Sequence, residues 1–189
     1  MILASTSPRR YDLMTAAGYT FTVVPADVEE HADDRPPSLP ALTESNAALK
    51  ALHVASDHPD ELCVGADTLV YTGDTALGKP SDLDHAFAML KMLVGKTHQV
   101  CTGVCFARTG QSPLDHRFHE ITHVTFKPLT DGEIRHYLSA ISPLDKAGAY
   151  AAQDHGHLII DSTSGSYSNV VGLPMERLAA ELAGLEMTP

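Results

Sequence analysis

The sequence has no long apolar run. No stretch approaches the ~20 residues that a transmembrane helix needs, and the N-terminus has neither the charged region nor the long apolar region of a secretory signal. We therefore expect a cytoplasmic protein with no membrane partner. Repeats, low-complexity segments and dividing linkers are also missing. The 189 residues predict one soluble domain over 1–189, long enough to bury roughly 70% of its unfolded surface.

Cysteine is scarce. Cys63, Cys101 and Cys105 are an odd number in apolar, strand-like surroundings, which predicts buried free thiols rather than a disulfide framework. Cys101 and Cys105 can also be read as metal ligands, but no second Cys or His pair stands at zinc-finger spacing. The eleven histidines are scattered, and no HExxH motif occurs.

Basic residues are few as well. There are 13 Lys and Arg against 24 Asp and Glu, a net charge of −11. This balance argues against nucleic-acid polymers, whose binding depends on Lys and Arg contacts to phosphate. It leaves room for a small polyanion in a locally basic pocket. Five of the basic residues lie in or beside the motifs described below: Arg9, Arg10, Lys50, Lys79 and Lys146.

The order of predicted elements indicates an α/β fold. Apolar or alternating segments predict strands at 1–4, 19–24, 62–71, 97–108, 118–126 and 158–161. Helix patterns predict helices over 39–56 and 175–182. Three more are predicted to start at Pro8, after Ser81-Asp82 and at the T-x-x-E box of Thr130. The long segments at 97–108 and 118–126 suit an antiparallel pair.

The first strand runs into Ser5-Thr6-Ser7-Pro8-Arg9-Arg10. Ser7 is the expected N-cap and Pro8 the first helical residue. A helix start offers free backbone N–H groups and the positive end of the helix dipole, and two arginines there favour an anion site. An ordinary strand–helix connection with two solvated arginines explains the same residues equally well.

Two acidic positions stand out. Asp67 interrupts the apolar strand pattern LCVGADTLVY, where an unpaired carboxylate would be expensive to bury, so we expect a metal, a cation or a catalytic task there. Hydrogen bonds from backbone N–H groups at a bulge are the alternative. Glu30 ends an acidic run after the second strand, followed by a polar loop up to Pro37. Such a run is usually solvated, but it can also face a crevice.

Two lysines and a segment of small residues complete the pattern. On the helix at 39–56, Leu42, Leu49 and Leu52 form the expected apolar side, and Lys50 beside them can reach a pocket or simply lie on the surface. Lys79 stands between Gly78 and Pro80, after a turn at Gly73-Asp74. The segment 145–153 places small residues around Lys146 and Gln153, which permits close approach of a ligand.

Five motifs in this order resemble the Maf family of nucleotide pyrophosphatases over nearly the whole chain. They are A-S-T-S-P-R-R at 4–10, A-D-T at 66–68, G-K-P at 78–80, D-K-A-G-A-Y at 145–150 with Gln153, and V-G-L-P at 171–174. The resemblance implies a mixed, twisted sheet flanked by helices, with a central cleft between two lobes, as in inosine triphosphatases. It also implies hydrolysis of nucleoside triphosphates to monophosphate and pyrophosphate, a divalent cation (Mg²⁺ or Mn²⁺), and a homodimer.

The resemblance also implies roles for residues. Asp67 matches the catalytic proton acceptor and, with Glu30, the metal ligands; whether Asp67 acts mainly as base or as ligand stays open. Lys50 and Lys79 match the catalytic lysines. The substrate-binding set is Ser5, Ser7, Arg9, Arg10, Thr68, Lys146 and Gln153.

Arg9, Thr68 and Gln153 match the branch of the family that acts on dTTP and UTP, rather than the branch that acts on 7-methyl-GTP. Ala151-Ala152 and Asp154 depart from the residues usual beside the glutamine. A nucleotide-binding regulatory protein of cell division or septum formation is the alternative from another class. A purine-directed inosine triphosphatase is the alternative among enzymes.

Overall fold

The centre of the computed structural model is a mixed sheet of seven strands in the order β2-β1-β3-β5-β6-β7, with β4 paired to β3. The structure describes residues 1–31, 38–73 and 75–185. The strands are β1 (Ile2–Leu3), β2 (Thr22–Val23), β3 (Cys63–Thr72), β4 (Thr75–Leu77), β5 (Thr97–Arg108), β6 (Leu114–Phe126) and β7 (Ile160–Ser164). β1 is parallel to β2 and β3, and the other pairings are antiparallel. This confirms the predicted fold class.

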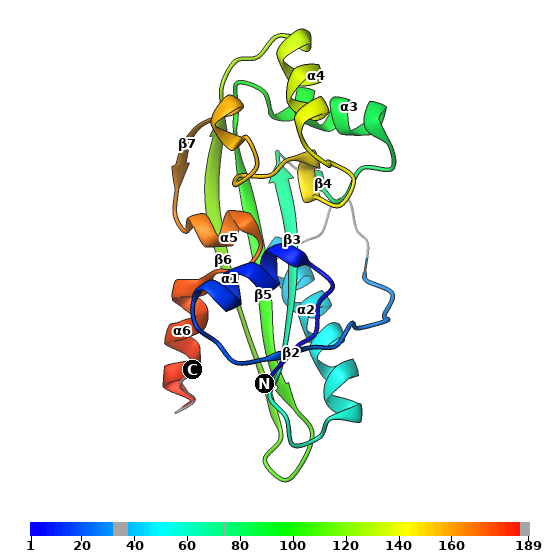
Figure 1. The fold of residues 1–189 in the computed structure, drawn as a ribbon, viewed down its shortest axis with the longest axis vertical. Helices are drawn as coiled ribbons and strands as arrows, with labels where there is room; N and C mark the ends of the chain where they lie inside the picture. Colours follow the sequence, from blue (N-terminus) through cyan, green and yellow to red (C-terminus); the bar gives the residue numbers. More distant parts are fainter. Residues whose placement is uncertain (32–37, 74, 186–189) are drawn as a thin grey trace.

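Helices cover both faces of the sheet, and the molecule is elongated along β5 and β6 (Figure 1). The α-helices are α1 (Pro8–Ala16), α2 (Leu39–Asp57), α3 (Leu83–Leu93), α4 (Asp131–Ala140), α5 (Tyr167–Val171) and α6 (Met175–Gly184), and the 3-10 helices are η1 (Ala147–Ala149) and η2 (Gly156–Leu158). α2 packs on one face of the lower sheet, while α1 and α6 pack on the other. α3 and α4 build a separate upper core around Phe126 and Tyr137.

Most predicted elements are confirmed, with differences at their ends. β6 begins at Leu114 rather than at 118, because its polar first residues pair in register with the end of β5. The last strand is Ile160–Ser164 rather than 158–161, since the chain from Gly156 first closes as η2. β4 and α5 were not predicted. The predicted turn at Asp74, and the polar loop from residue 32 to Pro37, lie outside the described residues.

Side-chain caps explain where several helices start. At α4 the predicted capping box is present: Glu133 N–H donates to Thr130 Oγ1, and Thr130 N–H donates to Glu133 Oε2 at 2.7 Å. Asp82 rather than Ser81 caps α3, accepting from His85 N–H at 2.7 Å. Ser7 occupies the predicted N-cap position of α1 and Pro8 is its first residue, although the Ser7 side chain makes no capping hydrogen bond. Its N–H instead donates to Ser5 Oγ at 3.2 Å.

The face of α2 against the sheet consists of small residues, not of the predicted leucines. Leu42, Leu49 and Leu52 are only partly buried, whereas Ala47 and Ala51 are fully buried. The cause lies in the sheet: a Cβ at Gly65 would overlap the backbone of α2 at Ala47, and one at Gly103 would overlap it at Thr43. Because the helix backbone lies directly on these glycines, only small side chains fit between helix and sheet.

The middle of β3 has a free edge. β1 pairs with β3 only at Cys63 and Val64, and β4 pairs with it only from Val70 to Thr72. In the part of the chain that the structure describes, the residues between these two pairings bond to β5 on one side and to no strand on the other. Successive side chains of a strand point to opposite faces, so Asp67 faces α2 while Thr68 faces α1 and α5.

The cysteines are free and buried, as predicted. Burial raises the pKa of Cys63 and of Cys101 to about 11 and that of Cys105 to about 12, so all three are thiols at neutral pH. Within the described residues, no group of three or more His, Cys, Asp or Glu side chains is arranged to hold a metal ion. None of the described helices is long and apolar enough to cross a membrane.

Candidate functional site

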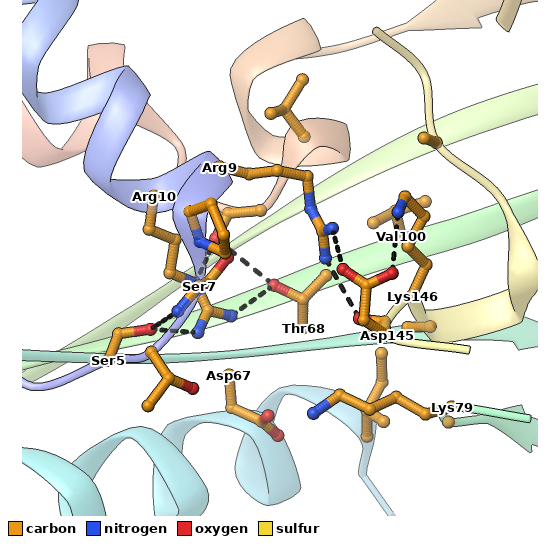
Figure 2. A pocket seen from close by; sticks show the side chains of 18 of the residues that line it. Ser5, Ser7, Arg9, Arg10, Asp67, Thr68, Lys79, Val100, Asp145 and Lys146 are labelled. Carbon is orange, nitrogen blue, oxygen red and sulfur yellow. Dashed lines mark hydrogen bonds and ion pairs between the residues drawn. The ribbon is translucent and has the colours of Figure 1, made fainter. Parts of the chain in front are cut away.

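A cleft of about 320 Å³ opens at the free edge of β3. Its walls come from the β1–α1 connection, the middle of β3, the loop at Gly78-Lys79, the segment around η1 and the end of α5. Figure 2 shows the arginines of α1 and Lys146 on one side of Thr68, and Asp67 and Lys79 on the other. The cleft therefore collects residues that lie far apart in the sequence, including every residue predicted for the site.

Asp67 is the buried acid of this cleft, with 6% of its surface exposed. Lys50 Nζ lies 3.2 Å from Asp67 Oδ1 and 2.8 Å from Glu30 Oε1. Asn46 Nδ2 donates to the second oxygen, Asp67 Oδ2, at 3.0 Å. The buried carboxylate is thus partnered by side chains of α2 rather than by backbone N–H groups at a bulge, and one ammonium draws both predicted metal ligands together.

Arg10 is held inside the protein, with 9% of its surface exposed. Its Nε donates to the Gly172 carbonyl at 2.8 Å, and its terminal nitrogens donate to Thr68 Oγ1 at 3.0 Å and Ser5 Oγ at 3.2 Å. Burial lowers the pKa of this guanidinium, and the negative charge of Asp67 acts in the opposite direction. Arg10 therefore joins α1, β3 and α5 while carrying positive charge to the floor of the cleft.

Arg9 and Lys146 share one carboxylate. Asp145 Oδ2 accepts from Arg9 at 2.8 Å, and Asp145 Oδ1 lies 2.7 Å from Lys146 Nζ. Lys146 also donates to the Ser142 carbonyl at 2.6 Å, which turns its ammonium away from Asp67. Burial would raise the pKa of Asp145, but the hydrogen bonds from Lys146 and Arg9 lower it overall. In this state an internal anion partners both cations.

Lys79 and the backbone N–H groups at the start of α1 are available to donate hydrogen bonds to a ligand. Lys79 is exposed, points toward Asp67 in Figure 2, and makes no hydrogen bond or ion pair with any described residue. The first intrahelical bond of α1 runs from Tyr11 N–H to the Ser7 carbonyl at 3.2 Å. The N–H groups of Arg9 and Arg10 precede it, so they lack helical partners.

Thr68, Gln153 and Asp154 differ in what they face. Thr68 Oγ1 is already bonded to Arg10 and lies 2.9 Å from Thr102 Oγ1. Gln153 is exposed and lines the cleft. Asp154 lines a neighbouring hollow between Ser139 and His155 instead. Although they are neighbours in a turn, Gln153 and Asp154 therefore face different hollows.

Comparison with known proteins decides the family. The family model described as "Maf-like protein" matches residues 1–185. The chain belongs to the Maf family. The dTTP/UTP pyrophosphatase of Akkermansia muciniphila is 44% identical over 98% of this chain and 96% of its own, and that of Desulforamulus reducens is 43% identical over 96% and 94%. Among solved structures, the Ham1 protein of Staphylococcus aureus shares the fold, with a TM-score of 0.56 at 15% identity over 97% of this chain and 98% of its own.

Two residues of this Maf cleft were missed by sequence reasoning. Asn46 reads as an ordinary helix residue, and its one signal is its place four residues before Lys50, which puts both on the same face of α2. Asp145 stands inside a quoted motif, yet only its neighbour Lys146 was given a role. Its adjacency to Lys146 was the one signal in the sequence, because Arg9, its other partner, lies 136 positions away.

Proposed function

We propose that this Maf protein hydrolyses dTTP and UTP, and modified forms of them, to the monophosphate and pyrophosphate. One observation carries the proposal: the buried Asp67 lies in the same cleft as Lys50, Lys79 and the paired arginines of α1. The names of the two relatives above supply the nucleotides, and their alignment with nearly the whole chain supports the transfer of the reaction. The reaction clears nucleotides from the cellular pool.

Charge neutralisation comes first, because the negative charge of a triphosphate repels an attacking hydroxide. Lys79 and the N–H groups at the start of α1 meet the phosphates directly. Arg9 and Lys146 become available as the phosphates replace Asp145 beside them. Arg10 stays in place and contributes positive charge from the cleft floor. Ser5 and Thr68 hold that guanidinium, and Ser7 bonds to Ser5, so all three act on the substrate through Arg10.

The residues present fit one Mg²⁺ or Mn²⁺ ion. Glu30 and Asp67 supply carboxylate oxygens, which hard cations prefer, and Lys50 already brings these oxygens together. Two protein carboxylates are few for a closed cage, but Mg²⁺ commonly takes one or two carboxylates and completes its shell with water and substrate phosphates. When bound, the cation supplies further positive charge to the phosphates.

Asp67 performs the proton transfer. Each of its oxygens accepts one hydrogen bond from α2, which fixes the carboxylate and leaves lone pairs for a water molecule. The water attacks the α-phosphorus, Asp67 accepts its proton, and pyrophosphate leaves. Lys50 pairs with Oδ1 of this carboxylate and holds it in place.

Gln153 reads the base. Its amide offers one donor group and one acceptor, which pair with the O4 and N3–H edge of uracil or thymine. Of the three residues that mark the dTTP/UTP branch, Arg9 and Thr68 are bonded to charged neighbours in the cleft, whereas Gln153 is exposed to it.

A nucleotide panel tests the proposal. Release of pyrophosphate from dTTP, UTP, CTP, GTP, ITP and 7-methyl-GTP is measured with Mg²⁺ or Mn²⁺, with Asp67→Asn as the inactive control. We expect dTTP and UTP to be preferred, with monophosphate and pyrophosphate as the only initial products. Preference for ITP would favour the purine-directed enzyme, and binding without turnover would favour the regulatory protein. Orthophosphate and diphosphate would mean attack at the γ-phosphorus.

We infer that the enzyme works as a cytoplasmic homodimer of one-domain subunits, without nucleic-acid polymers or membranes as partners. The family resemblance supports the dimer, and the net charge of −11 supports the absence of a nucleic-acid partner. Sedimentation equilibrium of the full chain tests the dimer: a mass near 20.2 kDa at all concentrations would contradict it.

A further inference from the structure

Every polar atom of the Asn46 side chain is hydrogen-bonded, next to the cleft residue Asp67. Asn46 is 2% exposed. Its Nδ2 donates to Asp67 Oδ2 at 3.0 Å and to the His31 carbonyl at 3.1 Å, and its Oδ1 accepts from His31 N–H at 2.8 Å. A primary amide has two N–H donors and one acceptor oxygen, so both donors and the oxygen are engaged. The His31 N–H needs an acceptor, which fixes the orientation of the amide.

These contacts close a ring around the two acidic residues. His31 follows Glu30 directly, so fixing the backbone of His31 fixes the point from which the Glu30 side chain starts. Glu30 is paired to Lys50, and Lys50 is paired to Asp67 Oδ1. Asn46 and Lys50 lie one helical turn apart on α2 and thus hold the two oxygens of Asp67 separately.

We propose that Asn46 is a positioning residue that sets the spacing of Glu30 and Asp67, and so the affinity of the site for its divalent cation in the nucleotide complex. The inference rests on the proposed function for the identity of the nucleotide. Asn46 contacts one carboxylate directly and the other through the backbone beside it. Residues that hold metal ligands in this way change metal affinity by about ten- to a hundredfold when they are replaced.

The amide of Asn46 matches the hydrogen-bonding groups around it better than other side chains would. A leucine would leave the His31 N–H and carbonyl and one Asp67 oxygen without their partner, and unpaired buried polar groups are unfavourable. An aspartate would add a negative charge to those of Glu30 and Asp67. It would also lack the N–H group that donates to the Asp67 carboxylate. Asparagine is neutral, accepts from one backbone group, and donates to the other and to the carboxylate.

The test measures binding rather than turnover. The probe is α,β-imido-dUTP, whose α–β bridge the enzyme does not cleave, titrated by calorimetry in Mn²⁺ and in EDTA. The readout is the factor by which Mn²⁺ tightens binding of the probe. In Asn46→Leu we expect this factor to fall about ten- to a hundredfold, with the affinity in EDTA changed less than about twofold.

Matched variants separate positioning from folding. Asn46→Ser is smaller and admits water to the unpaired groups, so it guards against misfolding of the leucine variant, and we expect the same direction of change. His53 lies on the same helix but is exposed. His53→Ala should therefore leave the tightening of probe binding by Mn²⁺ unchanged. Thermal unfolding confirms that each variant is folded.

Each result decides the proposal. Equal losses in Mn²⁺ and EDTA would mean that Asn46 merely maintains the structure, which overturns it. The proposal is also overturned if Mn²⁺ tightens binding of the probe equally in the native protein and in folded Asn46→Leu and Asn46→Ser. It is overturned as well if Mn²⁺ does not tighten binding in the native protein. Failure of the native protein to release pyrophosphate from dTTP or UTP would instead reject the proposed function, while a native factor that Asn46→Leu reduces would still support the positioning role.

Discussion

Arg9 of α1 and Asp145 of the segment before η1 form an ion pair across the cleft, with 2.8 Å between Arg9 Nη1 and Asp145 Oδ2. The same carboxylate pairs with Lys146 at 2.7 Å. Before substrate arrives, two cations of the proposed phosphate site are thus paired with the same carboxylate of the protein, which offsets part of their charge. A triphosphate has to compete with this internal anion.

Asp145→Asn should tighten anion binding, because it removes the competing charge. We expect the dissociation constant of inorganic pyrophosphate to fall by up to roughly fivefold, since partly exposed ion pairs contribute about 1 kcal/mol or less. The dissociation constant is measured by calorimetry at low and at high salt, and the gain in affinity over the native protein should be smaller at high salt. Asp161→Asn, an exposed residue of β7, is the control. Weaker binding in Asp145→Asn would show that the ion pair orders Arg9 for the ligand instead.

Asp67→Asn should abolish most of the turnover without unfolding the protein. The amide keeps the shape but cannot accept the proton of the attacking water, and loss of a general base usually lowers rates by about a hundredfold or more. The measurement is kcat for dTTP at saturating Mn²⁺, with Asp57→Asn at the exposed end of α2 as control. Near-normal kcat would remove Asp67 from the chemistry.

Gln153→Glu should change the base preference, because a carboxylate only accepts hydrogen bonds and favours a guanine-type edge. We expect kcat/KM for dTTP and UTP to fall by roughly ten- to a hundredfold, as each mismatched polar group is worth about 1–3 kcal/mol, while that for 7-methyl-GTP rises. Asp154→Asn, beside it but in the neighbouring hollow, should leave the ranking unchanged. An unchanged ranking in Gln153→Glu would mean that Gln153 does not read the base.

The sequence predicted the fold class, the order of most elements and a set of residues that all line the cleft, because strand alternation, caps and the motifs are local signals. What failed depends on tertiary contact. The leucines of α2 looked like its buried side, yet the glycines of β3 and β5 bring a different face to the sheet. The pairing of Arg9 with Asp145 joins residues 136 positions apart, and no local pattern reports such a contact.

Gly103→Ala should destabilise the protein through this same helix–sheet contact. The new methyl group would overlap the backbone at Thr43 and Glu44, so α2 has to move, at roughly 1–3 kcal/mol or more of unfolding free energy. Urea unfolding measures the loss. Gly184→Ala, where nothing lies near the added methyl group, is the control and should change stability far less.

Stability should fall between pH 6.5 and 4 through His98. Burial lowers the pKa of His98 from 6.5 to about 4, so the unfolded chain binds a proton in this range and the native protein does not. Unfolding is then increasingly favoured as the pH falls, by about 3 kcal/mol near pH 4. Urea unfolding is compared at pH 7 and pH 5 in the native protein and in His98→Gln. The difference between the two proteins gives the contribution of His98 to the pH dependence of stability. An equal pH dependence in both would contradict it.

The free edge of β3 has a consequence beyond catalysis. Unpaired strand edges are templates on which other chains add as strands, and proteins protect them with charges. Here the protection is supplied by the site itself, since Lys50 bonds to the Ala66 carbonyl at this edge and Asp67 lies beside it. We therefore expect apolar replacements of Lys50 and Asp67 to promote aggregation as well as to lower the proposed activity. The charges proposed for catalysis would then also protect this edge from other strands.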